Sequence, residues 1–269
     1  MKYCIATGKT TDWNTPLLIG GELVDNINQA ADLGYDAIEI HTPDIDILDA
    51  DAVNAALKAR NMFVATLGTG MIYGKYGLYL MDENEENVAK LIGMVKQFID
   101  VAAKIGSKVT IGSIKGNVPK GKDKAVGLDI MGHAIRKIDE YAGEKGVTIL
   151  LEATNRFENN ALNTGKELHD FIAKYGFKHV QALMDSFHIN IEEASIDNCL
   201  KDAGEYLGHI HFADNTRSYP GAGAFNFDLF CQSIKDIGYD GVLSVECFPR
   251  PDGITGAKET IKFFRKYFG

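Results

Sequence analysis

Short apolar runs alternate with longer segments of helical periodicity along the whole chain. Eight runs have the composition of β-strands, and they cover residues 3–6, 37–40, 63–67, 108–111, 148–151, 181–184, 208–212 and 242–245. Between them, apolar residues recur with helical spacing in GGELVDNINQAADLG, ENEENVAKLIGMVKQFIDVAAKIG, GLDIMGHAIRKIDEYAGEKG, TGKELHDFIAKYG and FNFDLFCQSIKDIG. The pattern therefore predicts repeated strand–helix units.

Glycines mark the ends of several predicted helices. Gly34, Gly106, Gly176 and Gly238 each follow the last periodic residues, where a left-handed backbone is favoured. Eight strand–helix units in 269 residues predict a (β/α)₈ TIM barrel, formed as a single domain over residues 1–269. An open doubly wound sheet is the less favoured alternative, because neither GxGxxG nor GxxxxGK[ST] follows a predicted strand.

The predicted rim of this barrel collects polar residues. The least regular stretches, 8–16, 68–82, 115–124 and 214–225, all follow strands, on the side that carries the active sites of such barrels. Four consecutive strands also end in or carry potential ligands, namely Glu152, Asp185, His211 and Glu246. Taken singly, each has an ordinary explanation: Asp185 could cap a helix, His211 could be a core histidine, and Glu246 could pair with Arg250.

Taken together, the four residues favour a metal site. Three carboxylates at one barrel mouth would repel one another and lose hydration unless a cation lay among them. Oxygen ligands and one imidazole suit Mn²⁺, Mg²⁺ or Co²⁺ better than a structural zinc, which prefers cysteine and histidine. The two glutamates, Glu152 and Glu246, could also hold a substrate carbon between them as acid and base.

Composition and charge exclude several partners. A formal net charge of −9 disfavours nucleic acids and anionic membranes, because both require a basic footprint. The four cysteines are scattered without a CxxC pair, which favours reduced thiols and a cytoplasmic location. The start MKYCIATGKTTDW has too short an apolar run for a signal peptide, and no stretch has the roughly 20 apolar residues of a membrane span.

Four segments carry a family resemblance. LEATNRFENNALNT, MDSFHINIEE, HIHFADNTRSYPGAGAFNF and LSVECFPRP resemble the signature segments of the xylose-isomerase-like TIM-barrel sugar isomerases and epimerases. They are most similar to the D-tagatose 3-epimerase, D-psicose 3-epimerase and inosose epimerase group. The resemblance implies an isomerase that epimerises a ketose or keto-polyol, such as a ketohexose or an inosose, at the carbon next to the carbonyl.

The resemblance also implies roles for individual residues. One divalent metal ion, Mn²⁺ in the first place and otherwise Mg²⁺, Co²⁺ or Zn²⁺, would be bound by Glu152, Asp185, His211 and Glu246. The two glutamates would exchange the C3 proton through a cis-enediolate. Glu158, His188 and Arg217 would bind the substrate, a small-molecule sugar or cyclitol. Their side chains suit this role, since Arg217 and His188 donate hydrogen bonds to developing negative charge and Glu158 accepts from a hydroxyl. The resemblance further implies a homodimer or homotetramer.

Two loops depart from the best-known ketohexose epimerases. The loop at residues 8–16 offers only Trp13 as a large ring, whereas those enzymes tend to be rich in aromatic residues there. The loop at residues 68–82 looks more like the inosose epimerase branch, with Tyr73, Tyr76 and Tyr79 as candidate walls of the substrate site. The same tyrosines could equally pack within their own loop. The turn SYPGAGAF is either a phosphate nest or, more simply, a loop closure.

Other functions of related barrels remain alternatives. A hydroxypyruvate isomerase or an inosose dehydratase would share this style of metal rim. An endonuclease-IV-like phosphodiesterase would need three zinc ions and more histidines at the rim, and Gly68-Thr69-Gly70 supplies no ligand. A non-catalytic sugar-binding barrel is less favoured, because it would be expected to lack the intact pair Glu152 and Glu246.

Overall fold

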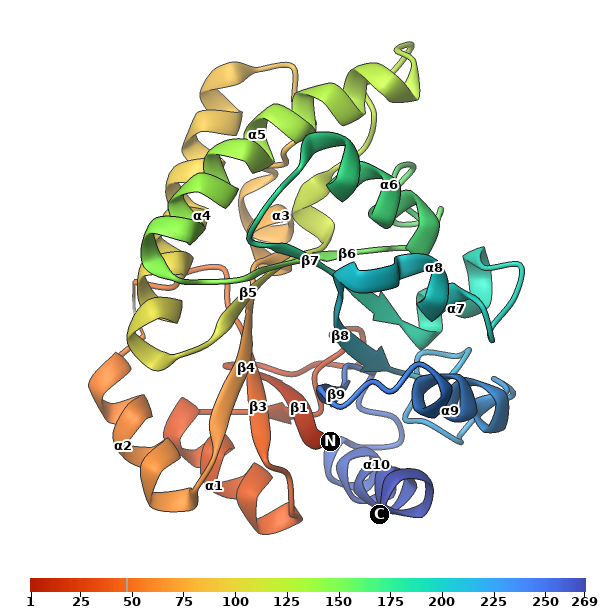
Figure 1. Ribbon diagram of the computed structural model, residues 1–269. Helices are drawn as coiled ribbons and strands as arrows, with labels where there is room; N and C mark the ends of the chain where they lie inside the picture. Colours follow the sequence, from red (N-terminus) through yellow and green to blue (C-terminus); the bar gives the residue numbers. More distant parts are fainter. Residues whose placement is uncertain (47) are drawn as a thin grey trace.

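The computed structural model describes residues 1–46 and 48–269, and its central feature is a closed parallel barrel (Figure 1). Eight strands form the barrel: β1 (Lys2–Gly8), β3 (Ala37–His41), β4 (Phe63–Gly68), β5 (Lys108–Ile111), β6 (Ile149–Glu152), β7 (Val180–Asp185), β8 (Leu207–Phe212) and β9 (Val242–Val245). Each strand pairs with the next, and β1 pairs with β9 to close the ring. The short strand β2 (Ile19–Gly20) adds to β1. The predicted (β/α)₈ barrel is confirmed.

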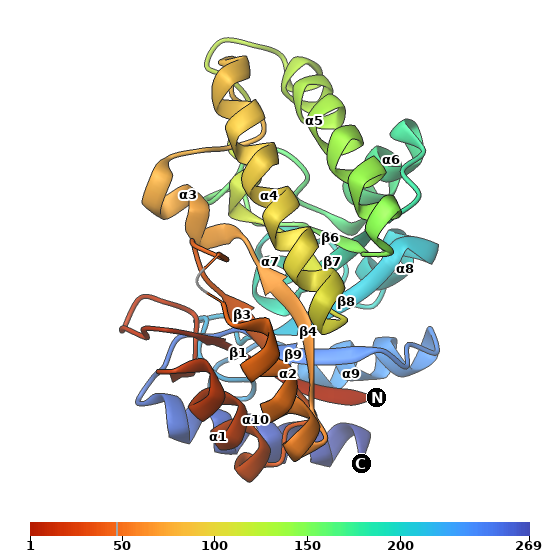
Figure 2. The same cartoon turned by 90° about the vertical axis from the view of Figure 1, so that its left-hand side faces the viewer.

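Helices surround the barrel and fill the connections between strands (Figure 2). They are α1 (Leu23–Leu33), α2 (Ala50–Arg60), α3 (Gly70–Tyr76), α4 (Glu85–Ile105), α5 (Lys124–Lys145), α6 (Gly165–Tyr175), α7 (Ser186–Glu192), α8 (Cys199–Ala203), α9 (Phe227–Asp236) and α10 (Gly253–Phe268), with 3₁₀ turns η1 (Ser113–Lys115) and η2 (Gly204–Tyr206). The five helical segments named from the sequence correspond to α1, α4, α5, α6 and α9. The four helix-ending glycines all have positive φ, between 58° and 94°.

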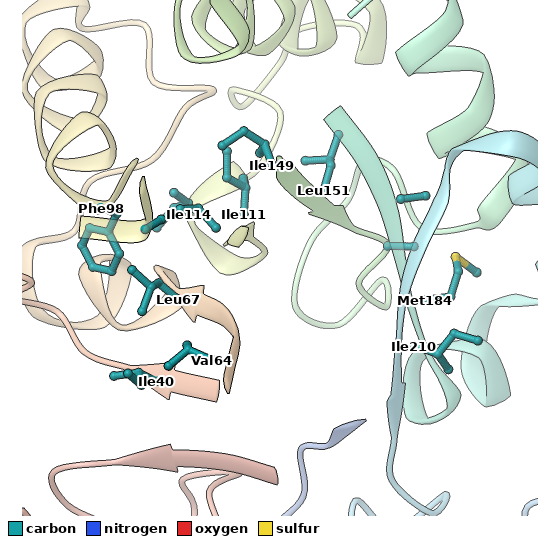
Figure 3. Close-up of a cluster of buried hydrophobic side chains, with 14 of the residues drawn as sticks. Ile40, Val64, Leu67, Phe98, Ile111, Ile114, Ile149, Leu151, Met184 and Ile210 are labelled. Atoms are coloured by element: carbon teal, nitrogen blue, oxygen red, sulfur yellow. The ribbon is translucent and has the colours of Figure 1, made fainter. Parts of the chain in front are cut away.

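The alternation of side chains along the strands separates two environments. In β3, Ile38 and Ile40 belong to the main hydrophobic cluster that the strands share with the helices, and Figure 3 shows part of this layer. Successive strand residues point to opposite faces, so Glu39 and His41 point into the barrel. Both make hydrogen bonds there, and Glu39 bonds to histidines of β8. The apolar layer thus holds the helices on the barrel, while the interior towards the rim is free for polar chemistry.

Both ends of the chain are fixed to the barrel. Tyr3 of β1 stacks on Phe264 of α10, with ring centroids 5.2 Å apart.

All four cysteines lie among the described residues and are buried and free. Within residues 1–46 and 48–269, no helix combines the length and apolar character needed to cross a membrane.

Candidate active site

The four predicted ligands lie together at the carboxyl ends of the strands. Glu152 and Asp185 are the last residues of β6 and β7, His211 lies one residue before the end of β8, and Glu246 directly follows β9. Asp185 and His211 are paired in register across the β7–β8 ladder. One side-chain ligand atom from each residue lies within 4.8 Å of those of the other three. The barrel thus brings together the set that the sequence predicts.

The atoms that face one another in this cluster suit a cation. Glu152 Oε1, Asp185 Oδ2 and His211 Nδ1 are buried and find no hydrogen-bond partner among the described residues. Unpaired buried polar atoms are costly, so three of them in one place indicate a missing partner. Two carboxylate oxygens and an imidazole nitrogen are ligands of a hard or borderline divalent ion, and the residues therefore fit the metal that the sequence predicts.

Asp185 serves the fold and the site at once. Its Oδ1 accepts from the backbone N–H of Phe187 at 2.9 Å and caps the N-terminus of α7, which is the ordinary role considered for it. Its Oδ2 remains free and faces the cluster. Glu246 does not take up the alternative pairing with Arg250, because that guanidinium lies over the rings of Trp13 and Phe248 instead.

Burial and mutual repulsion shift the pKa values of the carboxylates. Burial, together with the charge of Glu246, raises the pKa of Glu152, and burial raises the pKa of Asp185 to about 6. Burial would also raise the pKa of Glu246, but His211, His41 and Arg217 outweigh it and lower that pKa. A bound divalent cation would favour the ionised form of every carboxylate in the cluster.

His188 of α7 points a hydrogen-bond donor at the cluster. Its Nδ1 accepts from the backbone N–H and the side-chain amide of Asn155, at 3.2 and 2.7 Å. The ring proton must therefore be on Nε2, which lies 3.8 Å from Glu152 Oε1 and 3.9 Å from Asp185 Oδ2. Burial and the guanidinium of Arg217 hold the pKa of His188 well below its usual range. His188 is thus a neutral donor at the cavity.

Arg217 spans the rim of the same cavity. Its Nη1 donates to Glu158 Oε1 at 2.8 Å, and its Nη2 lies 3.7 Å from Glu246 Oε2. The guanidinium packs over the rings of Phe187 and Phe248, at 4.9 and 5.6 Å. Arg217 also has a left-handed backbone conformation, with φ of 57°. This conformation is unfavourable for a residue other than glycine, and such strained residues are common at functional sites. Both residues of the Arg217–Glu158 ion pair line the cavity.

The cavity has a volume of about 180 Å³, and short side chains form much of its wall. Gly68, Thr69, Gly70 and Met71 line one side, and the loop at residues 8–16 contributes Thr15 and Pro16. The candidate aromatic walls lie elsewhere: Tyr73 packs edge to face on Tyr79 at 6.1 Å, and Tyr76 donates to Asp44 at 2.5 Å. Trp13 is 58% exposed and stacks with Arg250. None of the three tyrosines is among the described residues that line the cavity, and two of them, Tyr73 and Tyr79, pack on each other within the loop.

The turn at residues 218–225 is filled by the protein's own carboxylate. The fully buried Asp214 accepts from the backbone N–H groups of Gly221 and Gly223 at 2.9 and 2.8 Å, and from that of Phe225 at 3.1 Å. An anion nest occupied in this way has no free N–H groups for a phosphate. The turn is therefore a loop closure that fixes the chain after Arg217.

Lys115 and Glu39 are two fully buried charged residues near the cluster that the sequence analysis did not identify. Lys115, in η1, donates to the backbone oxygen of Glu152, and to Thr154 Oγ1 at 3.1 Å. Glu39 accepts hydrogen bonds from three histidines, which include His211. A lysine in an irregular loop and a glutamate inside a strand carry no local signal of such a role.

The match to a family model agrees with this geometry. The model of the xylose isomerase-like TIM barrel family matches residues 27–267. The chain belongs to this family. The family that the four strand-end segments predict is confirmed.

Relatives within the family are sugar epimerases. D-psicose 3-epimerase of Agrobacterium fabrum is 30% identical over 257 residues, which are 90% of this chain and 84% of that protein. D-psicose 3-epimerase of Ruminiclostridium cellulolyticum is 38% identical over 132 residues, but this match spans only 49% of the chain and 44% of that protein. A crystal structure of D-psicose 3-epimerase in the presence of D-fructose has the same fold, with a TM-score of 0.84 at 23% identity and full coverage of both chains. These relatives confirm the expected class of enzyme, an isomerase of the epimerase type.

Proposed function

We propose that the protein is a divalent-metal-dependent epimerase of an unphosphorylated ketose or keto-polyol, acting on the carbon next to the carbonyl. The observation that carries the proposal is a pair of glutamates, Glu152 at the end of β6 and Glu246 directly after β9. Both belong to one cluster of potential ligands, and both line the same cavity. Two carboxylates that face a common substrate carbon are suited to remove a proton on one side and return one on the other.

The proposed chemistry divides between the ion and the side chains. A cation bound by Glu152, Asp185, His211 and Glu246, which we propose to be Mn²⁺ with Mg²⁺, Co²⁺ or Zn²⁺ as alternatives, would polarise the substrate carbonyl. One glutamate removes the proton from the adjacent carbon, which gives a cis-enediolate, and the other glutamate protonates the opposite face. Arg217 and His188 donate hydrogen bonds to the oxygen on which negative charge develops, and Glu158 accepts from a substrate hydroxyl.

The cavity wall favours a neutral polyol over a sugar phosphate. Among the described lining residues, Arg217 is the one with a permanent positive charge, and it is already paired with Glu158. A phosphate group would need further cations or free backbone N–H groups. The wall instead includes the hydroxyl residues Thr15 and Ser113, which suit the hydroxyl groups of a ketohexose or an inosose.

A substrate screen tests the proposal. Purified protein with Mn²⁺ would be incubated with D-fructose, D-tagatose, L-ribulose, an inosose and hydroxypyruvate, each beside its phosphate ester where one exists, and the products followed by NMR. We expect epimerisation next to the carbonyl of at least one free sugar or cyclitol, and its loss when a chelator removes the metal. Isomerisation of hydroxypyruvate, or dehydration of the inosose, without any epimer would instead favour the alternative activities.

Metal binding should depend on the ligands one by one. Asp185→Asn and His211→Ala each remove one of the four proposed ligands. Both variants should therefore bind the ion less tightly and be purified with less metal than the parent protein. Elemental analysis measures the occupancy. Asp139→Asn, which alters a buried carboxylate that binds the backbone of Lys178 and His179, is a control that should retain its metal. Full occupancy in both ligand variants would contradict the ligand set.

Arg217 should act on the substrate. Arg217→Met keeps an unbranched chain between the two phenylalanine rings but removes the donors, and should lower kcat/KM at least ~10-fold, about 1.4 kcal/mol of transition-state binding. Arg156→Met is the matched control, because Arg156 is an exposed arginine that pairs with Glu192 at 2.9 Å. Steady-state kinetics and thermal melting compare the two. Unchanged kcat/KM with a large loss of Tm in Arg217→Met would indicate a purely structural ion pair.

We also propose that the chain is a single domain that assembles as a homodimer or homotetramer. Phe157, in the loop that leads to Glu158, is 82% exposed, and we infer that its ring contacts another subunit of the assembly. Light scattering of the purified protein measures its mass, and a monomer at micromolar concentration would contradict the assembly.

A further inference from the structure

Glu39 is a carboxylate placed behind the metal-site residues. It lies in the middle of β3, points into the barrel and is fully buried. Its Oε1 contacts His209 Nε2 at 2.7 Å and His211 Nε2 at 3.2 Å, and its Oε2 contacts His41 Nε2 at 3.2 Å. All three imidazoles present the same ring nitrogen to one carboxylate.

This arrangement determines which nitrogen of each ring carries the proton. A carboxylate oxygen accepts hydrogen bonds, so each Nε2 must be the donor, and Nδ1 of a neutral ring keeps its lone pair. The Nδ1 of His211 is the buried, unpartnered atom of the ligand cluster. The Nδ1 of His41 lies 3.7 Å from Glu246 Oε1. Glu39 therefore leaves Nδ1, with its lone pair, as the nitrogen that His211 and His41 present to the site.

The two oxygens of Glu39 contact two histidines that lie on either side of the Glu246 carboxylate. Through Oε1, Glu39 orients His211, whose Nδ1 lies 3.6 Å from Glu246 Oε2, and through Oε2 it orients His41, which faces Glu246 Oε1. His41 packs closely against Gly68, since a Cβ added to that residue would lie 2.4 Å from His41 Nδ1. A single buried carboxylate thus links a predicted metal ligand with the surroundings of a predicted acid/base residue.

We propose that Glu39 is a positioning residue, which fixes the tautomers and orientations of His211 and His41 and thereby holds the metal ligand and Glu246 in their working geometry. The inference rests on the proposed metal-dependent function. Glu39 contacts His211 but is not itself one of the four proposed ligands, and it is not among the residues that line the cavity. Carboxylates that orient metal-bound histidines typically change metal affinity 10- to 100-fold when they are replaced.

The first test is a matched pair of carboxylate-to-amide substitutions. Glu39→Gln keeps the shape of the side chain but replaces one acceptor oxygen with an NH₂ donor, so at least one facing histidine must change its tautomer or turn away. Asp139→Asn makes the same chemical change at another buried carboxylate, at the opposite end of the strands. Titration of free Mn²⁺ by EPR should show binding at least ~10-fold weaker in Glu39→Gln and unchanged in Asp139→Asn. Equal affinity in the two variants would overturn the proposal.

The second test does not depend on a variant that folds. Long-range ¹H–¹⁵N spectra of the wild-type protein loaded with diamagnetic Zn²⁺, labelled at histidine, report the tautomer of each ring. The cation is needed because, without it, Glu39 and Glu246 outweigh burial and raise the pKa of His211 well above its usual range. We expect His211 and His41 to carry their proton on Nε2. A proton on Nδ1 of neutral His211 would overturn the proposal, because that nitrogen could then not bind a metal from this position.

Both measurements are independent of sugar turnover. If none of the tested sugars is epimerised but Mn²⁺ binding still depends on Glu39, the function proposed above fails and the role of Glu39 at the metal cluster stands. If sugars are epimerised and Glu39→Gln binds Mn²⁺ as tightly as the parent protein, the function stands and the positioning role is wrong.

Discussion

Replacing Glu246 with glutamine is expected to lower kcat for epimerisation by about 10²- to 10⁴-fold, the range that a general acid or base contributes. The amide has nearly the shape of the carboxylate, but it can neither accept nor return a proton. Glu152, Asp185 and His211 remain in place, so the variant should keep its fold and part of its metal affinity. Rates measured at saturating Mn²⁺ separate the loss of the base from the loss of metal.

Glu192→Gln is the control for this substitution. Glu192 is a mostly buried carboxylate that ends α7, and it pairs with Arg156. Its replacement disturbs an ion pair near the rim without changing the ligand cluster, so kcat should stay within a factor of about two of the parent value. A Glu246→Gln enzyme with a near-normal rate would show that Glu246 is not an acid or base in the reaction.

The four predicted ligands could be identified from the sequence because the carboxyl ends of all strands in a parallel barrel lie at the same rim. Once eight strands are recognised, the residue that ends each strand must lie at the carboxyl rim, whatever the exact packing. Glu152, Asp185 and Glu246 each follow an apolar run directly, and this is a local signal. His211 lies within its strand, so whether its side chain points into the barrel depends on the alternation of side chains.

The remainder of the site depends on contacts between distant segments. Glu39 in AIEIH and His209 in GHIHF are 170 residues apart, and neither segment indicates that the two side chains meet at 2.7 Å. The same holds for Lys115, whose loop looks irregular in the sequence but places the ammonium under the backbone of Glu152. For Tyr73 and Tyr79 the sequence left substrate contact and packing within the loop equally open, and the structure shows the two rings packed edge to face.

Solvent hydrogen should enter the product at the epimerised carbon. If one glutamate removes the hydrogen as a proton and the other delivers a proton to the opposite face, the delivered proton comes from a group that exchanges with solvent. In D₂O, nearly every molecule of epimerised product should therefore carry deuterium at that carbon, as NMR or mass spectrometry can measure. A hydride shift carries the original hydrogen across and predicts an epimer or isomer without deuterium.

Single replacement of each glutamate should separate exchange from inversion. In Glu246→Gln, Glu152 can still remove a proton from its own face and return a deuteron to the same face, so one epimer should gain deuterium without conversion. Glu152→Gln should show the same behaviour with the other epimer, because only Glu246 and the opposite face remain active. The kcat for epimerisation should again fall by about 10²- to 10⁴-fold in each variant. Exchange of the same epimer by both variants would contradict two bases on opposite faces, because each variant would then use a common third group.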